Sequence, residues 1–308
     1  MATSILTSVE MMDLLPSKDS CIIQSYVNNE QLMKYLEILT PSNYALIHSF
    51  LSNGLGLKKY PHEYRNLVNL MAEIAPKVIQ FAGYKMVMKK GRYREFLYRN
   101  QILDISFKTG GLACTELDSM IDKLPIIEMF RHIYRKCANK QLVISNYGLF
   151  VSFPKNLPQD MHRDASELTS HSLYTPLPSL ITILIALTSQ QCDTTQKTTT
   201  GSTVFQLFSH IPEHLLKTKK TNANVQIVMD KGDMIVFGGS LMHFGGAYNF
   251  KAKDQRILGY IVLQVNGFKD KNMEKQKQLP SVLLPSKYNV IRKDNKVVVQ
   301  PLRLAQRQ

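Results

Sequence analysis

The sequence predicts a mainly β protein, an antiparallel sandwich or barrel, with helices from its N-terminal part packed against it. Helix-like spacing of apolar residues is confined to residues 1 to about 140. From residue 141 onward, short runs of β-branched and aromatic residues take over, and no helical pattern separates them. Strands without intervening helices are typical of antiparallel sheets rather than of parallel α/β sheets.

The helices are expected where apolar residues recur three and four positions apart, in segments 31–39, 64–83 and 117–137. Pro125 is expected to interrupt the last segment, because proline has no amide hydrogen and clashes with the preceding turn. We expect these helices to pack against one side of a sheet domain.

The strands are expected in five runs, at 141–153, 179–188, 202–208, 225–237 and 256–265. Within the fourth run, residues 230–233 read Asp-Lys-Gly-Asp and predict a tight turn between two strands. The polar, low-complexity stretch at 192–202 predicts a mobile loop. The chain therefore divides into a mostly helical region at 1–140, a β core at 141–268 and a basic extension at 269–308.

The overall charge is strongly positive. The 308 residues include 38 Lys and Arg against 24 Asp and Glu, which gives a formal charge of +14. Such a charge attracts nucleic acid, anionic lipid or an acidic small molecule. Basic residues alternate with aromatic ones in residues 85–99, a pattern that could bind phosphates and stack on bases. A solvated basic face is the commoner meaning of such a segment, and we favour it here.

The four cysteines, at positions 21, 114, 137 and 192, are far apart and form no C-x-x-C pair. This spacing argues against a zinc site and a disulfide scaffold, and it fits a reducing compartment. The first twenty residues lack the pattern of a secretory signal. The longest apolar run, at 180–187, is too short to cross a bilayer. We therefore expect an intracellular protein, cytoplasmic or nuclear.

Residues 162–164 read His-Arg-Asp, which occurs both in protein kinase loops and in metal sites. In a kinase, an Asn that holds magnesium follows the Asp at fixed spacing, a Gly-rich phosphate loop lies upstream and Asp-Phe-Gly lies downstream. This chain has Thr169 at the Asn position and neither of the other motifs. The sequence therefore excludes a protein kinase.

The metal-site interpretation accounts for more of the chain. In an extended segment, His162 and Asp164 project on the same side of the backbone. The best third ligand is His243, which we expect at the end of an apolar strand between pairs of glycines. Two histidines and one carboxylate leave three coordination positions open, as in non-haem Fe(II) oxygenases. Arg256, thirteen residues after His243, could bind the carboxylate of a cosubstrate.

Three other histidines compete for the ligand role. None of them ends an apolar strand, so we interpret them as loop or surface residues: His171, His210 and His214.

The joint pattern resembles the Fe(II)- and 2-oxoglutarate-dependent dioxygenases, and it is most similar to their phytanoyl-CoA hydroxylase branch. A Pro-containing strand end precedes the H-x-D motif at 152–164, a Gly-led strand ends in Ser-His at 201–210, and a G-D-x-x-x-F strand precedes the distal histidine at 232–243. The resemblance covers roughly residues 140 to 266.

The resemblance implies a double-stranded β-helix, a cupin-like jelly roll, over 141–268. It implies that Fe(II) is bound by His162, Asp164 and His243, and that the distal carboxylate of the cosubstrate 2-oxoglutarate pairs with Arg256. The implied reaction is oxidation of 2-oxoglutarate to succinate and carbon dioxide, coupled to hydroxylation of a substrate.

Two details depart from the family pattern. Leu207 and Phe208 replace the Pro-Gly of its Ser-His loop, and no Ser or Thr lies two positions beyond Arg256. We expect a Ser, Tyr or Lys within residues 147–155 to make a further contact to the cosubstrate.

The substrate implied by the resemblance is a small organic or lipid-derived molecule, and the positive charge favours an anionic one. Two alternatives remain open: a base in DNA or RNA, and a non-catalytic β-sandwich that only binds a partner.

Overall fold

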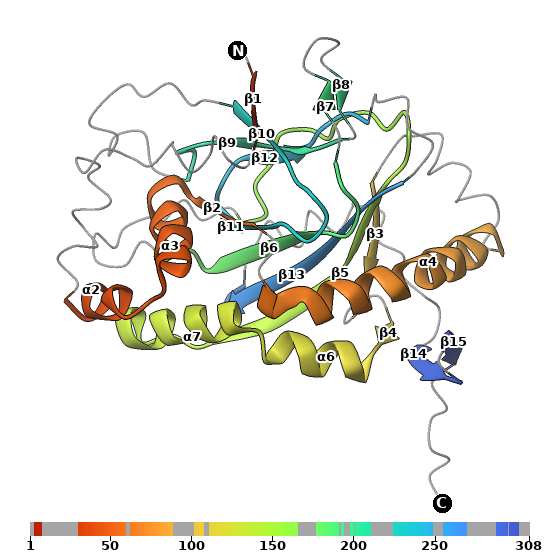
Figure 1. Cartoon of the computed structure of the whole chain (residues 1–308), viewed down its shortest axis with the longest axis horizontal. Coiled ribbons are helices and arrows are strands. Elements are labelled where there is room, and N and C mark those ends of the chain that lie inside the picture. The colour runs from red at the N-terminus through yellow and green to blue at the C-terminus, as the bar shows by residue number, and fades with distance from the viewer. Residues whose placement is uncertain are drawn as a thin grey trace, which may run out of the picture.

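The structure is a computed structural model. It describes residues 3–7, 30–59, 62–88, 102–107, 111–165, 177–190, 192–193, 198–199, 201–210, 224–248, 255–269, 288–294 and 296–301. Its architecture is mainly antiparallel β, with helices along one side (Figure 1).

The centre of the molecule is a six-stranded sheet in which every neighbouring pair of strands is antiparallel. In order across the sheet, the strands are β2 (Leu55–Lys58), β11 (Met234–Gly238), β6 (Leu180–Ala186), β13 (Arg256–Val265), β5 (Leu142–Ser152) and β3 (Leu103–Ser106). Strands β5, β6, β11 and β13 correspond to predicted runs. The two outer strands, β2 and β3, lie within the region predicted to be mostly helical, so that region also supplies both edges of the central sheet.

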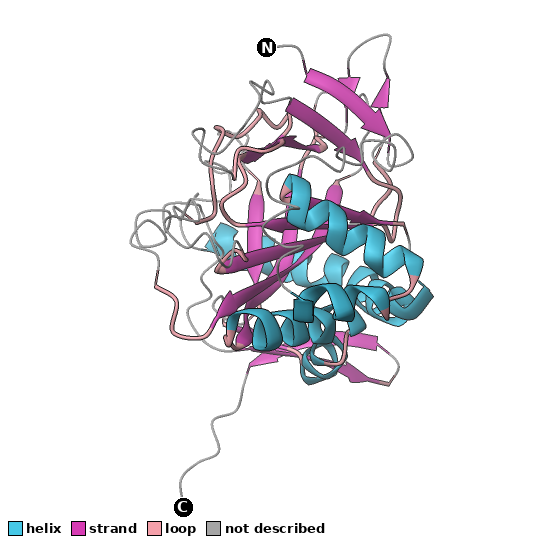
Figure 2. Cartoon of the chain, turned by 90° about the vertical axis from the view of Figure 1, so that its left-hand side faces the viewer, coloured by secondary structure: helices cyan, strands magenta, loops and turns pink. Residues whose placement is uncertain are grey.

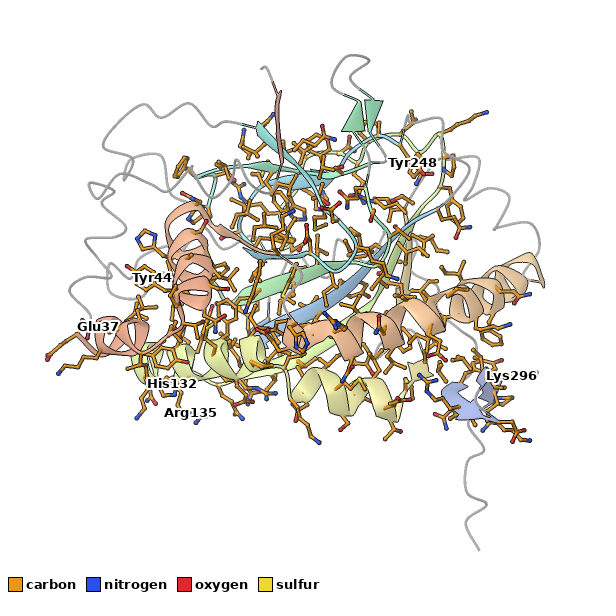
Figure 3. All side chains as sticks on the ribbon, in the orientation of Figure 1. Glu37, Tyr44, His132, Arg135, Tyr248 and Lys296 are labelled. Atoms are coloured by element: carbon orange, nitrogen blue, oxygen red, sulfur yellow. The ribbon has the colours of Figure 1, made fainter. Side chains whose placement is uncertain are left out.

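A four-stranded sheet faces the larger one. Its order is β1 (Thr3–Thr7), β10 (Asn224–Val228), β9 (Thr203–Gln206) and β12 (His243–Gly245), with β1 and β10 parallel and the other pairs antiparallel. One apolar cluster joins the two sheets, with Leu184 and Phe237 from the larger and Phe205 and Ile227 from the smaller. Side chains fill the space between the sheets, as Figure 3 shows.

The helices cover the other face of the six-stranded sheet, as Figures 1 and 2 both show. They are α2 (Glu30–Glu37), α3 (Pro41–Asn53), α4 (Arg65–Met88), α6 (Thr115–Asp122) and α7 (Pro125–Ala138), with a short 3-10 helix at His62–Tyr64. Pro125 is the first residue of α7, a position where the missing amide hydrogen costs nothing. The predicted interruption is therefore a boundary between two helices. Helix α3 was not predicted from the sequence.

Strand β6 shows why the central sheet needs apolar residues on both faces. Its odd-numbered residues, Ile181, Ile183 and Ile185, are fully buried in the cluster that contains the helices. Its even-numbered residues point toward the smaller sheet, where Leu184 and Ala186 pack. A strand covered on both sides reads as a continuous apolar run. Burying one such isoleucine contributes about 1.5–3 kcal/mol.

Two smaller sheets complete the described structure. Strand β14 (Tyr288–Lys293) pairs with β15 (Lys296–Pro301) and with β4 (Leu112–Ala113). The C-terminal extension thus contains a hairpin that joins the helical region. Strands β7 (Cys192–Asp193) and β8 (Thr198–Thr199) pair within the segment that was predicted to be a loop.

Gly148 in β5 gives a testable property of the fold. A Cβ at this position would meet the carbonyl oxygen of Ile105 and would lie 2.8 Å from Tyr260 Oη. We expect Gly148→Ala to lower the free energy of unfolding by about 1–3 kcal/mol, the usual cost of overpacking. Chemical denaturation measures this. The matched control is Gly259→Ala on the adjacent strand, where a Cβ would meet the flexible end of Met71. An equal loss in both variants would contradict the explanation.

Candidate metal centre

The three predicted ligands lie together. His162 and His243 form an isolated antiparallel bridge, in which each backbone amide donates to the carbonyl of the other residue at 3.0 and 2.9 Å. This bridge places the two imidazole rings side by side, with centroids 4.5 Å apart. Asp164 follows two residues after His162, and one ligand atom from each of the three residues lies within 4.8 Å of the others. The cluster has the composition and spacing to hold a metal ion.

Both histidines are oriented by backbone carbonyls. His162 Nδ1 lies 2.8 Å from the carbonyl oxygen of Asp160, and His243 Nδ1 lies 3.0 Å from that of Leu241. We assign the ring proton to Nδ1 in each case, because a carbonyl oxygen can only accept. The Nε2 atoms are then free, and they lie 3.9 and 3.6 Å from Asp164 Oδ1. Hydrogen bonding of this kind fixes the tautomer of a metal-binding histidine.

The electrostatics favour the neutral form of His243. Burial lowers the pKa of His243, the Asp164 carboxylate opposes this shift, and the neighbouring His162 adds to it. A neutral imidazole with a free Nε2 is the form that binds a metal.

One detail of the prediction was wrong. His243 does not end the apolar strand β11; it is the first residue of the separate strand β12. Between the two strands the chain turns, and Leu241 N donates to the carbonyl of Gly238 at 2.9 Å. Gly239 lets the chain pass close to its neighbours in this turn, because a Cβ there would lie 2.7 Å from Leu180 Cδ2 and 3.2 Å from Ala165 Cβ. The turn carries His243 from the larger sheet to the smaller one.

Thr182 holds the carboxylate ligand, a role that was not predicted from the sequence. Its Oγ1 donates to Asp164 Oδ2 at 3.2 Å, which leaves Oδ1 directed at the two imidazoles. Thr182 could have been recognised in the sequence as the one hydroxyl residue within an otherwise apolar strand.

Thr182→Val should weaken metal binding by roughly 10- to 100-fold, the usual effect of losing a residue that orients a ligand. Valine keeps the shape of the side chain and removes only the donor to Asp164. Calorimetric titration with Zn(II) measures the affinity, and Thr182→Ser should restore it. An unchanged affinity in Thr182→Val would show that Asp164 needs no such support.

Arg256 is a buried cation. Its side chain is 3% exposed, Nη1 donates to the carbonyl of Gly201, and Nη2 donates to Ser152 Oγ at 2.9 Å. Its Nε is buried and has no hydrogen-bond partner among the described residues. Burial lowers the pKa of Arg256 to about 10, which still leaves the guanidinium charged at neutral pH. The described part of the chain thus gives this cation neutral partners but no carboxylate.

Ser152 lies within the segment 147–155, in which we expected a further contact to a cosubstrate. It contacts Arg256 directly, across the pairing of β5 with β13.

One cavity joins the cluster to Arg256. Its volume is about 210 Å³, and its lining includes His162, Asp164, His243 and Arg256. Pockets that enclose a drug-sized ligand usually measure about 300–1,000 Å³. Most of the remaining wall is apolar, with Phe150, Leu180, Leu184, Phe237, Leu258 and Val262.

The competing histidines are only partly described. His171 and His214 lie outside the described residues. His210 lies in a turn, as predicted, and is half-buried: both ring nitrogens are buried without a partner among the described residues, and a Cβ on Gly54 would meet the ring. Burial lowers the pKa of His210 to about 4. It is not part of the metal cluster.

The basic segment 85–99 is described only up to residue 88, so its predicted role in binding phosphates lies outside the described residues. Among the helices that the structure describes, none is long and apolar enough to span a membrane. Cys114 and Cys137 are free thiols.

Comparisons with known proteins gave structural similarities only. No protein-family model matches the chain, and no curated protein matches its sequence. One similar structure is the non-heme α-ketoglutarate-dependent carbocyclase SnoK from nogalamycin biosynthesis, with 14% identity, a TM-score of 0.47, and coverage of 82% of this chain and 96% of that chain.

Two further similar structures have the same TM-score of 0.47. They are a non-heme monooxygenase, ThoJ, in complex with nickel (15% identity, 73% of this chain and 79% of that chain) and HygX from Streptomyces hygroscopicus with nickel and 2-oxoglutarate bound (12% identity, 75% and 89%). These similarities assign the chain to no family, and its chemistry is inferred below from its own residues.

Proposed function

We propose that the protein is an Fe(II)- and 2-oxoglutarate-dependent oxygenase. His162, Asp164 and His243 would hold the iron, and Arg256 would bind the distal carboxylate of 2-oxoglutarate. One observation carries the proposal: two free imidazole nitrogens and a carboxylate oxygen converge in the same cavity as a buried guanidinium with no carboxylate partner among the described residues.

The cluster fits the proposed metal. Two histidines and one carboxylate, with their other polar atoms hydrogen-bonded to protein, form the three-ligand arrangement that leaves positions open for other molecules. The described partners of Asp164 include no Lys or Arg that would compete with a metal for its carboxylate.

Arg256 fits the proposed cosubstrate. A buried charge without a counterion is costly, and a carboxylate that accepts two parallel hydrogen bonds offsets that cost. Leu258, two positions beyond Arg256, also lines the cavity and offers an apolar contact where many relatives have a hydroxyl. Ser152, on the neighbouring strand, supplies a hydroxyl beside the guanidinium instead.

The reaction follows from these contacts. When bound, Fe(II) and 2-oxoglutarate supply the chemistry that activates O2: one oxygen atom ends in succinate, carbon dioxide is released, and the other oxygen atom is inserted into a C–H bond of the substrate. The protein's part is to hold the keto acid at Arg256, to orient the ligands through Asp160, Leu241 and Thr182, and to exclude water with an apolar wall.

Within these oxygenases, we propose that the protein belongs to the phytanoyl-CoA hydroxylase branch. We further propose that the reaction on its substrate is hydroxylation and that residues 141–268 form the catalytic core. The motifs at 152–164, 201–210 and 232–243 support this position. A nucleic-acid base as substrate and a purely binding role stay as alternatives.

Anaerobic titration of the full chain with Fe(II) and then with 2-oxoglutarate tests the proposal, followed by measurement of succinate on admission of O2. We expect one equivalent of each to bind and succinate to form slowly even without substrate. Failure to bind Fe(II) would favour a binding protein. Screening with metabolites, peptides and oligonucleotides then separates the substrate classes, and binding to oligonucleotides should weaken steeply with salt if phosphates are contacted.

A further inference from the structure

A second polar cluster lines the same cavity, and neither the metal site nor the proposed keto-acid site uses it. It consists of Asp104, Asn146 and Tyr260. They come from three neighbouring strands, β3, β5 and β13.

The hydrogen bonds of this cluster run in one direction. Ser106 Oγ donates to Asn146 Oδ1 at 2.6 Å, Asn146 Nδ2 donates to Tyr260 Oη at 3.2 Å, and Tyr260 Oη donates to Asp104 Oδ1 at 2.8 Å. Asp104 is therefore the final acceptor. Its second oxygen, Oδ2, makes no hydrogen bond to the described residues, and no Lys or Arg among them pairs with it.

Asp104, the acidic member of the cluster, lies across the central sheet from the strand that supports Asp164. Tyr260 crosses over Gly148, which has no side chain to obstruct it, and reaches toward the edge strand β3. Thr182, which holds Asp164, is on β6, and two strands separate β6 from β3. At about 4.8 Å per strand, Asp104 and Thr182 are roughly 14 Å apart across the sheet.

The cluster is also distinct from the Arg256 end of the cavity. Arg256 and Tyr260 are four residues apart on β13 and share a face, which corresponds to about 13 Å along the strand. Asp104 pairs with Phe150, which pairs with Leu258, so Asp104 is two residues from Arg256 along the sheet and two strands away from it. The cavity thus carries a cation without a carboxylate partner among the described residues at Arg256, and an acidic group on the edge strand β3. A keto acid with two carboxylates is attracted to the first group and repelled by the second.

We infer that Asp104, Asn146 and Tyr260 form a substrate subsite that binds a hydroxyl or amino group on an otherwise apolar small molecule. The inference rests on the proposed function, because it takes the cavity to be an oxygenase active site. The open oxygen of Asp104 accepts from such a group, and the remaining N–H of Asn146 can donate to a hydroxyl. The apolar wall, with Ile102, Phe150, Leu184 and Val262, contacts the rest of the molecule.

A purely structural role explains the cluster less well. Tying β3 to the sheet requires the hydrogen bond of Tyr260 but not a carboxyl group with one open oxygen. Burial raises the pKa of Asp104 to about 6, and the hydrogen bond from Tyr260 only partly opposes the shift. The fold thus keeps an acidic group where ionisation is disfavoured, which is typical of a site that meets a ligand.

The subsite narrows the substrate class. The charge of +14 suggested an anionic substrate, but an anion would be repelled at Asp104. The chemistry of the cavity instead favours a neutral alcohol or a cationic amine.

The test is ligand-detected NMR titration of the full chain with four probes that share a cyclohexyl ring: cyclohexanol, cyclohexylamine, methoxycyclohexane and cyclohexanecarboxylate. We expect the alcohol and the amine to bind roughly tenfold or more tightly than the ether, since a hydrogen bond to a charged group changes affinity by about that factor. With 2-oxoglutarate occupying Arg256, the carboxylate should bind least. Asp104→Asn should weaken amine binding roughly 10- to 100-fold, and Tyr260→Phe should weaken alcohol binding to a smaller extent.

Matched controls lie on the opposite face of the sheet. Tyr147 Oη donates to Asp118 Oδ1 at 2.6 Å, a Tyr–Asp pair that does not line the cavity. Tyr147→Phe and Asp118→Asn should leave the four affinities unchanged. Equal binding of alcohol and ether by the unaltered protein would overturn the inference, even if Asp104→Asn did not fold. The inference would also be overturned if Tyr147→Phe and Asp118→Asn lost as much affinity for the probes as the cavity variants do.

Each titration is run with and without Zn(II) and 2-oxoglutarate. Discrimination among the probes without any binding of metal or keto acid would keep the polar subsite and reject the oxygenase. Binding of both metal and keto acid without discrimination among the probes would keep the oxygenase and reject the subsite.

Discussion

His162→Ala and Asp164→Ala are expected to abolish the conversion of 2-oxoglutarate to succinate. Each change removes one of three ligands, and Fe(II) binds weakly enough among the divalent metals that two ligands should not retain it. Asp164 also supplies the only negative charge in the cluster. The measurements are anaerobic titration with Fe(II) and succinate release in air, and both signals should disappear together.

The matched control for this prediction is His132→Ala. His132 belongs to α7, where its ring stacks on Tyr35, and Figure 3 shows it on the outer side of the helical layer. The control should bind iron and release succinate as the unaltered protein does. Full turnover in both ligand variants would refute the metal assignment.

Arg256→Leu is expected to separate cosubstrate binding from metal binding. The affinity for 2-oxoglutarate should fall roughly 10- to 100-fold or more, because a charge-assisted pair is lost. Iron binding should change little, since Arg256 is not part of the three-ligand cluster. Without ligands, the variant should be as stable as the unaltered protein or more stable, because a buried cation without a counterion has been removed.

Thermal unfolding with increasing 2-oxoglutarate checks all three expectations, because a ligand that binds only the folded state raises the midpoint, and a tighter ligand raises it more at the same concentration. Arg256→Lys keeps the positive charge but loses the planar guanidinium, so its affinity for 2-oxoglutarate should lie between those of Arg256→Leu and the unaltered protein. Arg131→Leu is the control for losing an arginine, since Arg131 pairs with Asp122 and Glu128 outside the cavity. The same midpoint shift in Arg256→Leu and in the unaltered protein would place the keto acid elsewhere.

The local pattern predicted most of the strands that carry the site. The runs that became β5, β6, β9, β11 and β13 were visible because each is apolar at every second position or throughout. The same pattern failed for β2 and β3, which have four residues each and lie between helices. Segments so short give too few periods to distinguish a strand from a helix end.

The sequence by itself determined the residue types of the proposed centre: a His-x-Asp pair, a distal histidine and an arginine at the start of a strand. Which residues contact them was decided only by the tertiary structure. It bridged His162 to His243, placed Thr182 behind Asp164 and brought Asp104 to Tyr260 from 156 residues away. Side-chain alternation along a strand is a local property, whereas the partner and register of that strand depend on packing between distant segments.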